Sequence, residues 1–325
     1  SPTKSEKNQI LLEQASMAFR ISDMLVYRSM AIFFLSVASF INFLGTPSLA
    51  RTVTDQLGRN VTVPDEPRRI VSLAPNITEI IFSLGQERRL IGVTRYSDFP
   101  SEAEKLPKVG FYVHLDLEKI VALKPDLCIA IKDGNPIAVA KRLESLKIPV
   151  YAVYPRKLET IMQTVLEIGG LINAEKRADL LVQNMDFRIQ KVKSLVSNVT
   201  YRPRVFFQIG VSPIVSVGTH TFIHGLIVLA GGTNIAEGPV SYPRFSREQV
   251  LGLSPEVIII TSMARAAIFE QVKAEWSKWP DLPAVRNQRI FLEDSNFFDR
   301  PTTRLVDGLE LLLRLIHPEL FKEAE

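Results

Sequence analysis

The segment EKIVALKPDLCI, residues 118–129, returns about 130 residues further along the chain as EQVLGLSPEVII, residues 248–259. Each copy opens on a glutamate, continues as a short helix, meets a proline that ends the helix, and runs into an aliphatic stretch typical of a buried strand. The duplication predicts two similar lobes with a cleft between them. Each lobe would place one carboxylate, Glu118 or Glu248, at an equivalent point on its rim.

Short aliphatic stretches alternate with helical segments on both sides of the repeat. This alternation predicts an α/β fold of two similar lobes, each with a mainly parallel sheet covered by helices on both faces. A hairpin is expected ahead of the first lobe, over residues 53–63. The expected strands cover residues 69–74, 90–93, 126–131 and 150–153 in the first lobe and 204–208, 256–260 and 289–292 in the second.

Residues 174–196 predict one long helix that joins the lobes. Their apolar side chains recur in steps of three and four from Ala178 to Val196, which places them on one stripe. At about 1.5 Å per residue the helix would be roughly 35 Å long. Such a stiff connection predicts closure around a ligand by a small hinge movement. The expected divisions are a leader over residues 1–50, an N-terminal lobe over 51–157, an inter-lobe helical segment over 158–200 and a C-terminal lobe over 201–325.

Local signals predict several helix boundaries. Thr78 is expected to cap a helix over residues 80–84. Gly169 and Gly170 are expected to end the helix that precedes the long one, and Asn173 to cap the long helix itself.

Residues 17–50 have the pattern of a cleaved secretory signal. Two arginines precede an apolar run over residues 30–44, and the small residues Ser48 and Ala50 follow it. We expect cleavage after about Ala50 and a free, monomeric protein in a Gram-negative periplasm, because no cysteine near the cut could carry a lipid. The alternative is a retained membrane anchor, although the apolar run is shorter than the ~20 residues needed to span a bilayer.

Charge and cysteine content exclude several function classes. The formal net charge is +4, and so small an excess without a basic run argues against nucleic acid as a partner. Cys128 is the only cysteine and is expected in the core, since it lies in an apolar run. The sequence has no Walker lysine loop, no Gly-x-Ser-x-Gly elbow and no cysteine cluster. Catalysis therefore has no visible apparatus, and no intrinsic cofactor is expected.

Three tyrosines in expected loops are the candidates for the cleft. Tyr96 follows the second expected strand, and Tyr112 and Tyr242 each stand six residues before a glutamate that opens the repeat. Loops at strand ends are where such folds bind ligands. Each tyrosine alone could be a surface or packing aromatic, but their recurrence ahead of both glutamates favours a ligand role.

The segment NFFDRP, residues 296–301, offers a polar cleft candidate, Arg300. Its guanidinium could donate hydrogen bonds to an amide or phosphate of a ligand. A local bond to Asp299 or Asp294 is the alternative.

His220 and His224 have the i, i+4 spacing of a helical metal pair. No third ligand is evident near them in the sequence. We therefore interpret them as ordinary helix residues and expect no metal site.

Glu118 and Glu248 have two interpretations. Asp116 and Ser246 stand two residues ahead of them and could be N-caps, so that each glutamate merely stabilises a helix dipole by ~0.3 to 1 kcal/mol. In the functional interpretation, two carboxylates on equivalent rims grip basic side chains of a partner. The two interpretations are compatible, since a first-turn glutamate can point outward.

These segments resemble the cobalamin-type periplasmic binding proteins of ABC importers, the family that also contains siderophore and haem receptors. The resemblance covers residues 69–317. It implies two α/β lobes joined by one long helix, with the ligand held between them. It also implies that the rim glutamates, here Glu118 and Glu248, form salt bridges with arginines of the membrane permease. Its most specific parts are YSDFP at 96–100, LEKIVALKPDL at 117–127 and FSREQVL at 245–251.

Position by position, the resemblance implies ligand contacts from the cleft loops. The tyrosine of the YSDFP segment and the aromatics ahead of the two glutamates match residues that contact the ligand in that family. Arg300 matches an arginine near the C-terminal helix, whereas Asn296 stands where an aspartate is expected and Val215 where a phenylalanine is expected. The implied ligand-binding set is Pro75, Tyr96, Tyr112, Tyr242, Asn296 and Arg300.

The expected function is that of a receptor that captures a corrinoid and delivers it to an ABC permease with its ATPase subunits. An iron-siderophore or haem receptor of the same family is the alternative ligand class. An enzyme on a chelatase-like or nitrogenase-like two-lobe scaffold is the alternative from another class. One cysteine and four dispersed histidines supply neither metal-cluster ligands nor a clustered acid/base set, which argues against the enzyme.

Overall fold

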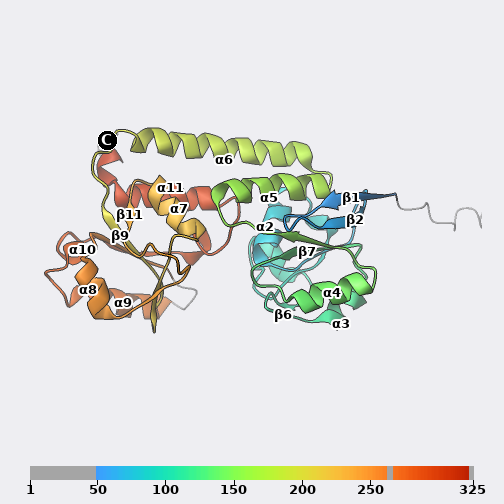
Figure 1. The fold of residues 1–325 in the computed structure, drawn as a ribbon, viewed down its shortest axis with the longest axis horizontal. Helices are drawn as coiled ribbons and strands as arrows, with labels where there is room; N and C mark the ends of the chain where they lie inside the picture. The colour runs from blue at the N-terminus through green and yellow to red at the C-terminus, as the bar shows by residue number, and fades with distance from the viewer. Residues whose placement is uncertain (1–48, 262–265, 322–325) are drawn as a thin grey trace, which may run out of the picture. The chain divides into compact units, whose positions relative to one another are not determined.

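Two β-sheets organise the part of the chain that the structure describes. The computed structural model describes residues 49–261 and 266–321, and residues from Ala50 onward belong to one compact unit (Figure 1). The predicted signal segment therefore lies outside the described residues, apart from Leu49 and Ala50. Within the described ranges, no helix is long and apolar enough to cross a membrane.

The N-terminal half of this unit contains two small hairpins and a four-stranded sheet. Its elements are β1 (Ala50–Thr54), β2 (Asn60–Pro64), β3 (Ile70–Ser72), α2 (Pro75–Ser83), η1 (Glu87–Arg89), β4 (Leu90–Gly92), η2 (Ser101–Lys105), β5 (Gly110–Phe111), β6 (His114–Leu115), α3 (Leu117–Ala122), β7 (Leu127–Ile131), α4 (Ile137–Ser145) and β8 (Val150–Val153). The sheet has the order β4-β3-β7-β8 with every pair parallel, and β1 and β2 form the predicted hairpin. Its strands are mostly buried and aliphatic, as a parallel sheet covered on both faces requires.

The C-terminal half contains a larger, mixed sheet. Its elements are β9 (Arg204–Gly210), β10 (Ile214–Ser216), α7 (Phe222–Leu229), β11 (Thr233–Asn234), β12 (Arg244–Phe245), α8 (Arg247–Leu253), β13 (Val257–Thr261), α9 (Ala266–Ser277), α10 (Pro283–Arg286), β14 (Ile290–Glu293), η3 (Ser295–Phe297), α11 (Leu305–Ile316) and η4 (Pro318–Phe321). β9, β11, β13 and β14 are joined by parallel pairs, whereas β10 and β12 add antiparallel pairs. β10 and β12, with three and two residues, were not predicted from the sequence.

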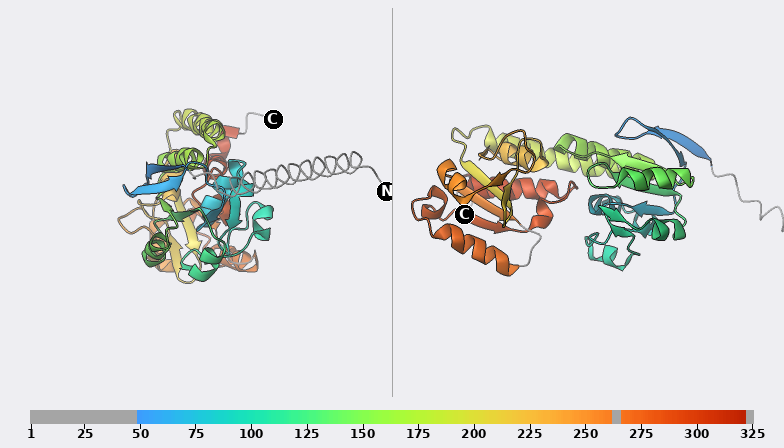
Figure 2. Two further views of the ribbon diagram at one scale, coloured as in Figure 1. Left: turned by 90° about the vertical axis from the view of Figure 1, so that its right-hand side faces the viewer. Right: turned by 60° about the horizontal axis from the view of Figure 1, so that its bottom comes forward.

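Two helices, α5 (Leu158–Leu171) and α6 (Glu175–Val196), connect the two halves. They lie side by side (Figure 1, Figure 2). Ala178 near the start of α6 packs into the core of the first sheet, and Met185 and later residues pack into a core of the second. The long connecting helix is therefore confirmed, with α5 as a second connection beside it.

Two predicted helix caps are wrong, and a third predicted boundary is close to the observed one. Thr78 lies inside α2, which begins at Pro75, because proline suits the first position of a helix. Gly169 and Gly170 lie in the last turn of α5, which ends one residue later at Leu171, close to the predicted end. Asn173 does not cap α6; its φ is 56°, and its side-chain amide donates to a backbone oxygen between β2 and β3 at 2.9 Å.

Gly169 permits a close approach of α5 and α6. A β-carbon at position 169 would lie 2.5 Å from the β-carbon of Ala178, whereas one at Gly170 would meet open space. We expect Gly169→Ala to lower the free energy of unfolding by about 1 kcal/mol, because overpacking outweighs the better helix propensity of alanine. The matched variant Gly170→Ala should raise the free energy of unfolding by up to about 1 kcal/mol, because alanine has the better helix propensity. Chemical denaturation measures both values, and equal stabilities would contradict the close contact.

The acid that follows the proline in each repeat has the same structural role in both halves. The Asp126 carboxylate accepts hydrogen bonds from the backbone N–H groups of Arg68 and Arg69, at 2.8 and 3.0 Å, just ahead of β3. The Glu256 carboxylate accepts one from the backbone N–H of Arg204, the first residue of β9, at 3.0 Å. Each acid thus fixes the start of the strand that pairs with its own.

Candidate functional site

A cavity of about 1230 Å³ lies at the carboxyl ends of parallel strands from both halves. Asp133 and Arg156 line it shortly after β7 and β8, and Glu293 lines it at the end of β14. Open α/β folds bind ligands at this edge, in the loops that follow the strands. The six residues predicted to contact a ligand all line this cavity: Pro75, Tyr96, Tyr112, Tyr242, Asn296 and Arg300.

The size of the cavity and its aromatic lining suit a large ligand with flat faces. Its volume, about 1230 Å³, exceeds the ~300–1,000 Å³ of sites for drug-sized molecules. Tyr96 and Tyr242 are each 54% exposed and Tyr112 is 37% exposed. These rings therefore retain free surface that a ligand can cover.

The backbone around Tyr96 and Tyr112 holds both rings in place. The Tyr112 ring lies against Gly134, where a β-carbon would come within 2.4 Å of it. The side-chain amide of Asn135 donates to the backbone oxygen of Tyr112 at 2.7 Å. The Tyr96 ring packs at 5.4 Å, between centroids, from that of Phe111. The two N-terminal tyrosines are thus positioned before any ligand binds.

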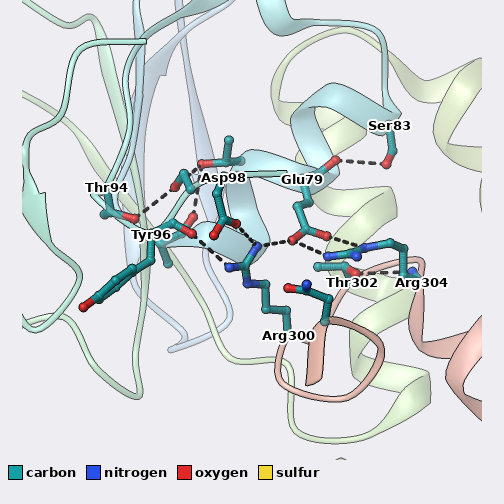
Figure 3. A network of polar contacts seen from close by, with 12 residues as sticks. Glu79, Ser83, Thr94, Tyr96, Asp98, Arg300, Thr302 and Arg304 are labelled. Atoms are coloured by element: carbon teal, nitrogen blue, oxygen red, sulfur yellow. Dashed lines mark hydrogen bonds and ion pairs between the residues drawn. The ribbon is translucent and has the colours of Figure 1, made fainter. Parts of the chain in front are cut away.

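Arg300 lines the cavity, but its guanidinium already has partners in the N-terminal half (Figure 3). One nitrogen lies 2.8 Å from Glu79 and 2.7 Å from Asp98, and another donates to the backbone oxygen of Tyr96 at 3.0 Å. Burial opposes the charge of Arg300, but the hydrogen bonds to Asp98 and Glu79 outweigh it and raise the pKa of Arg300. Among the described residues its ion-pair partners are therefore Glu79 and Asp98, and neither Asp299 nor Asp294.

Glu79 is the centre of this contact between the two halves. Its side chain is 3% exposed and also accepts from Arg304, at 2.9 and 2.8 Å. The Arg304 guanidinium lies 3.8 Å from the centroid of the Phe99 ring. A carboxylate of α2 is thus shared by two arginines that follow β14, and no local pattern in the sequence predicts this contact.

Arg156 makes a second contact between the halves. It donates to the backbone oxygen of His220 at 2.9 Å and pairs with Asp133 at 2.9 Å. His220 precedes α7 while His224 lies within it, so the two histidines do not share a helix. His224 contacts the amide of Asn234 at 3.1 Å. Within the described residues, no group of three or more side chains could hold a metal ion.

Glu118 and Glu248 lie in the first turns of α3 and α8, and both are exposed. Asp116 and Ser246 cap these helices through their side chains, so the prediction that both residues are N-caps is confirmed. Hydrogen bonds from its own backbone N–H and from Ser246 lower the pKa of Glu248, which keeps this carboxylate charged. Neither glutamate lines the cavity. The geometry therefore leaves both free to meet a partner.

Comparisons of the sequence and of the structure with known proteins lead to the same family. Residues 70–296 match the family model described as periplasmic binding protein. The chain is 31% identical to the vitamin B12-binding protein of Vibrio parahaemolyticus over 253 residues, which cover 77% of this chain and 90% of that protein. The structure of the periplasmic vitamin B12 binding protein BtuF of Vibrio cholerae has a TM-score of 0.70 at 29% identity, over 80% of this chain and 100% of that one. The structure of the periplasmic heme-binding protein RhuT from Roseiflexus sp. RS-1 in apo form also has a TM-score of 0.70, at 25% identity over 78% of this chain and 99% of that one.

Proposed function

Because this chain belongs to the periplasmic binding protein family, we propose that it captures a corrinoid, a cobalamin-like ligand, and delivers it to an ABC permease with its ATPase subunits. Proteins of this family are substrate-binding components of transporters and not enzymes. The observation that carries the ligand proposal is the cavity, in which six residues implied by the cobalamin-type resemblance come together from both halves. In this proposal the corrinoid is cargo and no resident cofactor is needed.

Three features support a corrinoid. The cavity of about 1230 Å³ can bury much of a ligand far larger than those of typical sites. Tyr96, Tyr112 and Tyr242 offer aromatic faces to a flat macrocycle. The names of the B12-binding relatives point to the same ligand class. Haem is the second candidate, since it is also a large flat macrocycle and a haem-binding protein shares this fold.

The remaining parts of the proposal concern the organisation of the receptor. It would be exported to the periplasm with the leader removed after about Ala50, and act as a monomer without nucleic acid. Its lobes would cover residues 51–157 and 201–325, with 158–200 as the connection. Glu118 and Glu248 would dock the permease.

Ligand titration of the purified chain tests the proposal. We expect calorimetry with cyanocobalamin to give saturable binding at one site per chain, and the bound protein to carry a corrin visible spectrum. Haemin is the comparison ligand, because its absorption bands differ from those of a corrin. Saturable haemin binding without any heat from cyanocobalamin would replace the corrinoid by haem, and no binding of either would remove both.

Aromatic substitutions test the assigned residues. We expect Tyr96→Ala and Tyr242→Ala each to weaken corrinoid binding about tenfold, or about 1.4 kcal/mol, because buried aromatic contacts dominate such interfaces. The matched control is Phe187→Ala, which removes a ring that is 69% exposed on α6 and does not line the cavity. Calorimetry of the three variants decides the point: equal losses in all of them would show that the cavity rings are not specific contacts.

A further inference from the structure

We propose that one part of the cavity wall, formed by Glu293, Asp294 and Asp299, makes the receptor select positively charged corrinoids over neutral ones and over ring ligands that carry carboxylates. We call these three residues the acidic wall. They come from the end of β14 and the segment that follows it, and all three line the cavity. The inference rests on the proposed corrinoid-binding function and adds the charge of the preferred ligand.

The basic residues of the cavity are already neutralised. In the described part of the chain, the lining contains two arginines and no lysine. Arg156 pairs with Asp133 at 2.9 Å, and Arg300 pairs with Asp98 at 2.7 Å and with Glu79 at 2.8 Å. Neither guanidinium is therefore available as the main partner of an anionic ligand.

Among the described residues, the carboxylates of the acidic wall lack ion pairs of this kind, although the charge of Arg300 acts on Asp299. Within residues 49–261 and 266–321, none of its three carboxylates forms an ion pair. Asp294 accepts a hydrogen bond from the backbone N–H of Asn296 at 2.9 Å. Burial raises the pKa of Glu293. Burial also raises the pKa of Asp299, although a hydrogen bond from Ser295 and the charge of Arg300 act in the opposite direction. Glu293 and Asp299 thus lose hydration without an ion-pair partner among the described residues, whereas Asp294 is exposed, and a cationic ligand would supply a partner.

An independent observation also points to a ligand. Asn76 lines the cavity and is 3% exposed, and its side-chain nitrogen has no hydrogen-bond partner among the described residues. Native proteins seldom leave a buried polar group unpaired, because the group loses its bonds to water. A hydrogen-bond acceptor of the ligand near Asn76 would satisfy this nitrogen. A matching ligand therefore has an acceptor near Asn76 and hydrogen-bond donors or positive charge near the acidic wall.

Corrinoids fit both requirements. The rim of a corrin carries primary amides, whose oxygens can accept from Asn76 and whose N–H groups can donate to the acidic wall. The cobalt centre adds positive charge when its axial ligands are water. Haem instead carries propionate carboxylates, which the acidic wall would repel through a partly desolvated medium.

Two forms of one corrinoid isolate the effect of charge. Diaquacobinamide is doubly positive and dicyanocobinamide is neutral, while their amide rims are the same. We expect the purified chain to bind the diaqua form at least tenfold more tightly than the dicyano form at low salt, and this ratio to shrink as salt is added, because salt screens charge. Calorimetry measures both affinities.

The decisive variant is Glu293→Gln/Asp299→Asn, which removes two charges with little change of shape and leaves Asp294, the cap of η3, in place. We expect it to bring the affinity ratio to within about threefold. The control Glu102→Gln/Glu104→Gln removes two exposed charges in η2, outside the cavity, and should keep the ratio. A ratio that is unchanged in the decisive variant overturns the inference, as does equal affinity of the native chain for the two forms.

The outcomes separate this inference from the proposed function. Binding of both cobinamide forms with equal affinity removes only the charge selection, whereas binding of neither removes the corrinoid function and the inference with it. His220 also lines the cavity and could favour the diaqua form by coordinating cobalt. Such coordination would survive neutralisation of the acidic wall and would shift the visible spectrum of the bound ligand. A ratio that persists with that spectral shift therefore assigns the preference to His220 and counts against the acidic wall.

Discussion

Replacement of Glu79 by alanine is expected to lower the free energy of unfolding by about 3 kcal/mol. Glu79 is 3% exposed and is shared by Arg300 and Arg304, whose side chains are 13% and 15% exposed. Removal of the carboxylate leaves the largely buried Arg304 without an ion-pair partner among the described residues and Arg300 with Asp98 alone. An uncompensated buried charge is what makes a broken pair costly. Denaturant unfolding followed by circular dichroism measures the loss.

An exposed ion pair provides the control for Glu79. Glu66 pairs with Arg68 at 2.8 Å, with side-chain exposures of 51% and 73%. Glu66→Ala should therefore lower the free energy of unfolding much less than Glu79→Ala does. The double variant Glu79→Ala/Arg304→Ala should lose less than the sum of its single variants, because the second change removes a charge that the first leaves unpaired. A loss for Glu79→Ala no larger than that for Glu66→Ala would show that the cluster does not stabilise the contact between the halves.

The second large effect is expected on transport. We expect Glu118→Ala/Glu248→Ala to reduce uptake by about tenfold or more, while ligand affinity stays within about twofold. Both glutamates are exposed and outside the cavity, and charges at an interface rim govern encounter with a partner more than binding elsewhere. Uptake of labelled ligand by cells that express the permease, together with calorimetry on the purified variant, measures the two quantities.

A matched pair of acids controls for net charge. Glu102 and Glu104 are exposed in η2, so Glu102→Ala/Glu104→Ala changes the charge of the protein by the same amount. This control should transport normally. Equal loss of uptake in both double variants would assign the effect to overall charge, and loss of ligand affinity with normal uptake would overturn the docking role.

The long, periodic elements of the fold could be predicted from the sequence. The strand at residues 150–153 and the connecting helix after Asn173 coincide with β8 and α6, because aliphatic runs and a regular apolar stripe are strong local signals. The packing role of Gly169 could not be predicted. The two glycines lie close to the end of α5, as expected, but Gly169 also permits the approach of α6, and that contact depends on tertiary packing.

The aromatic part of the site could be predicted, and its charged part could not. Tyr112 and Tyr242 were found because each stands at the same distance from a repeated glutamate. The partner of Arg300 is Glu79, 221 positions away, and no local pattern links two such residues. Glu293 could have been suspected from its place at the end of a strand in a parallel sheet, where ligands bind.

The acids that follow the repeated prolines also bear on the order in which the chain acquires structure. Asp126 reaches back 58 and 57 positions, and Glu256 reaches back 52, so each of these bonds stays within its own half. Loops of that length close at a lower entropic cost than loops that span the whole polypeptide. Because domains tend to fold as units during synthesis, the first sheet can be complete while the ribosome is still translating the second. The contacts between the halves, among them the Glu79 cluster and the bond from Arg156 to His220, must wait until the second half has been made.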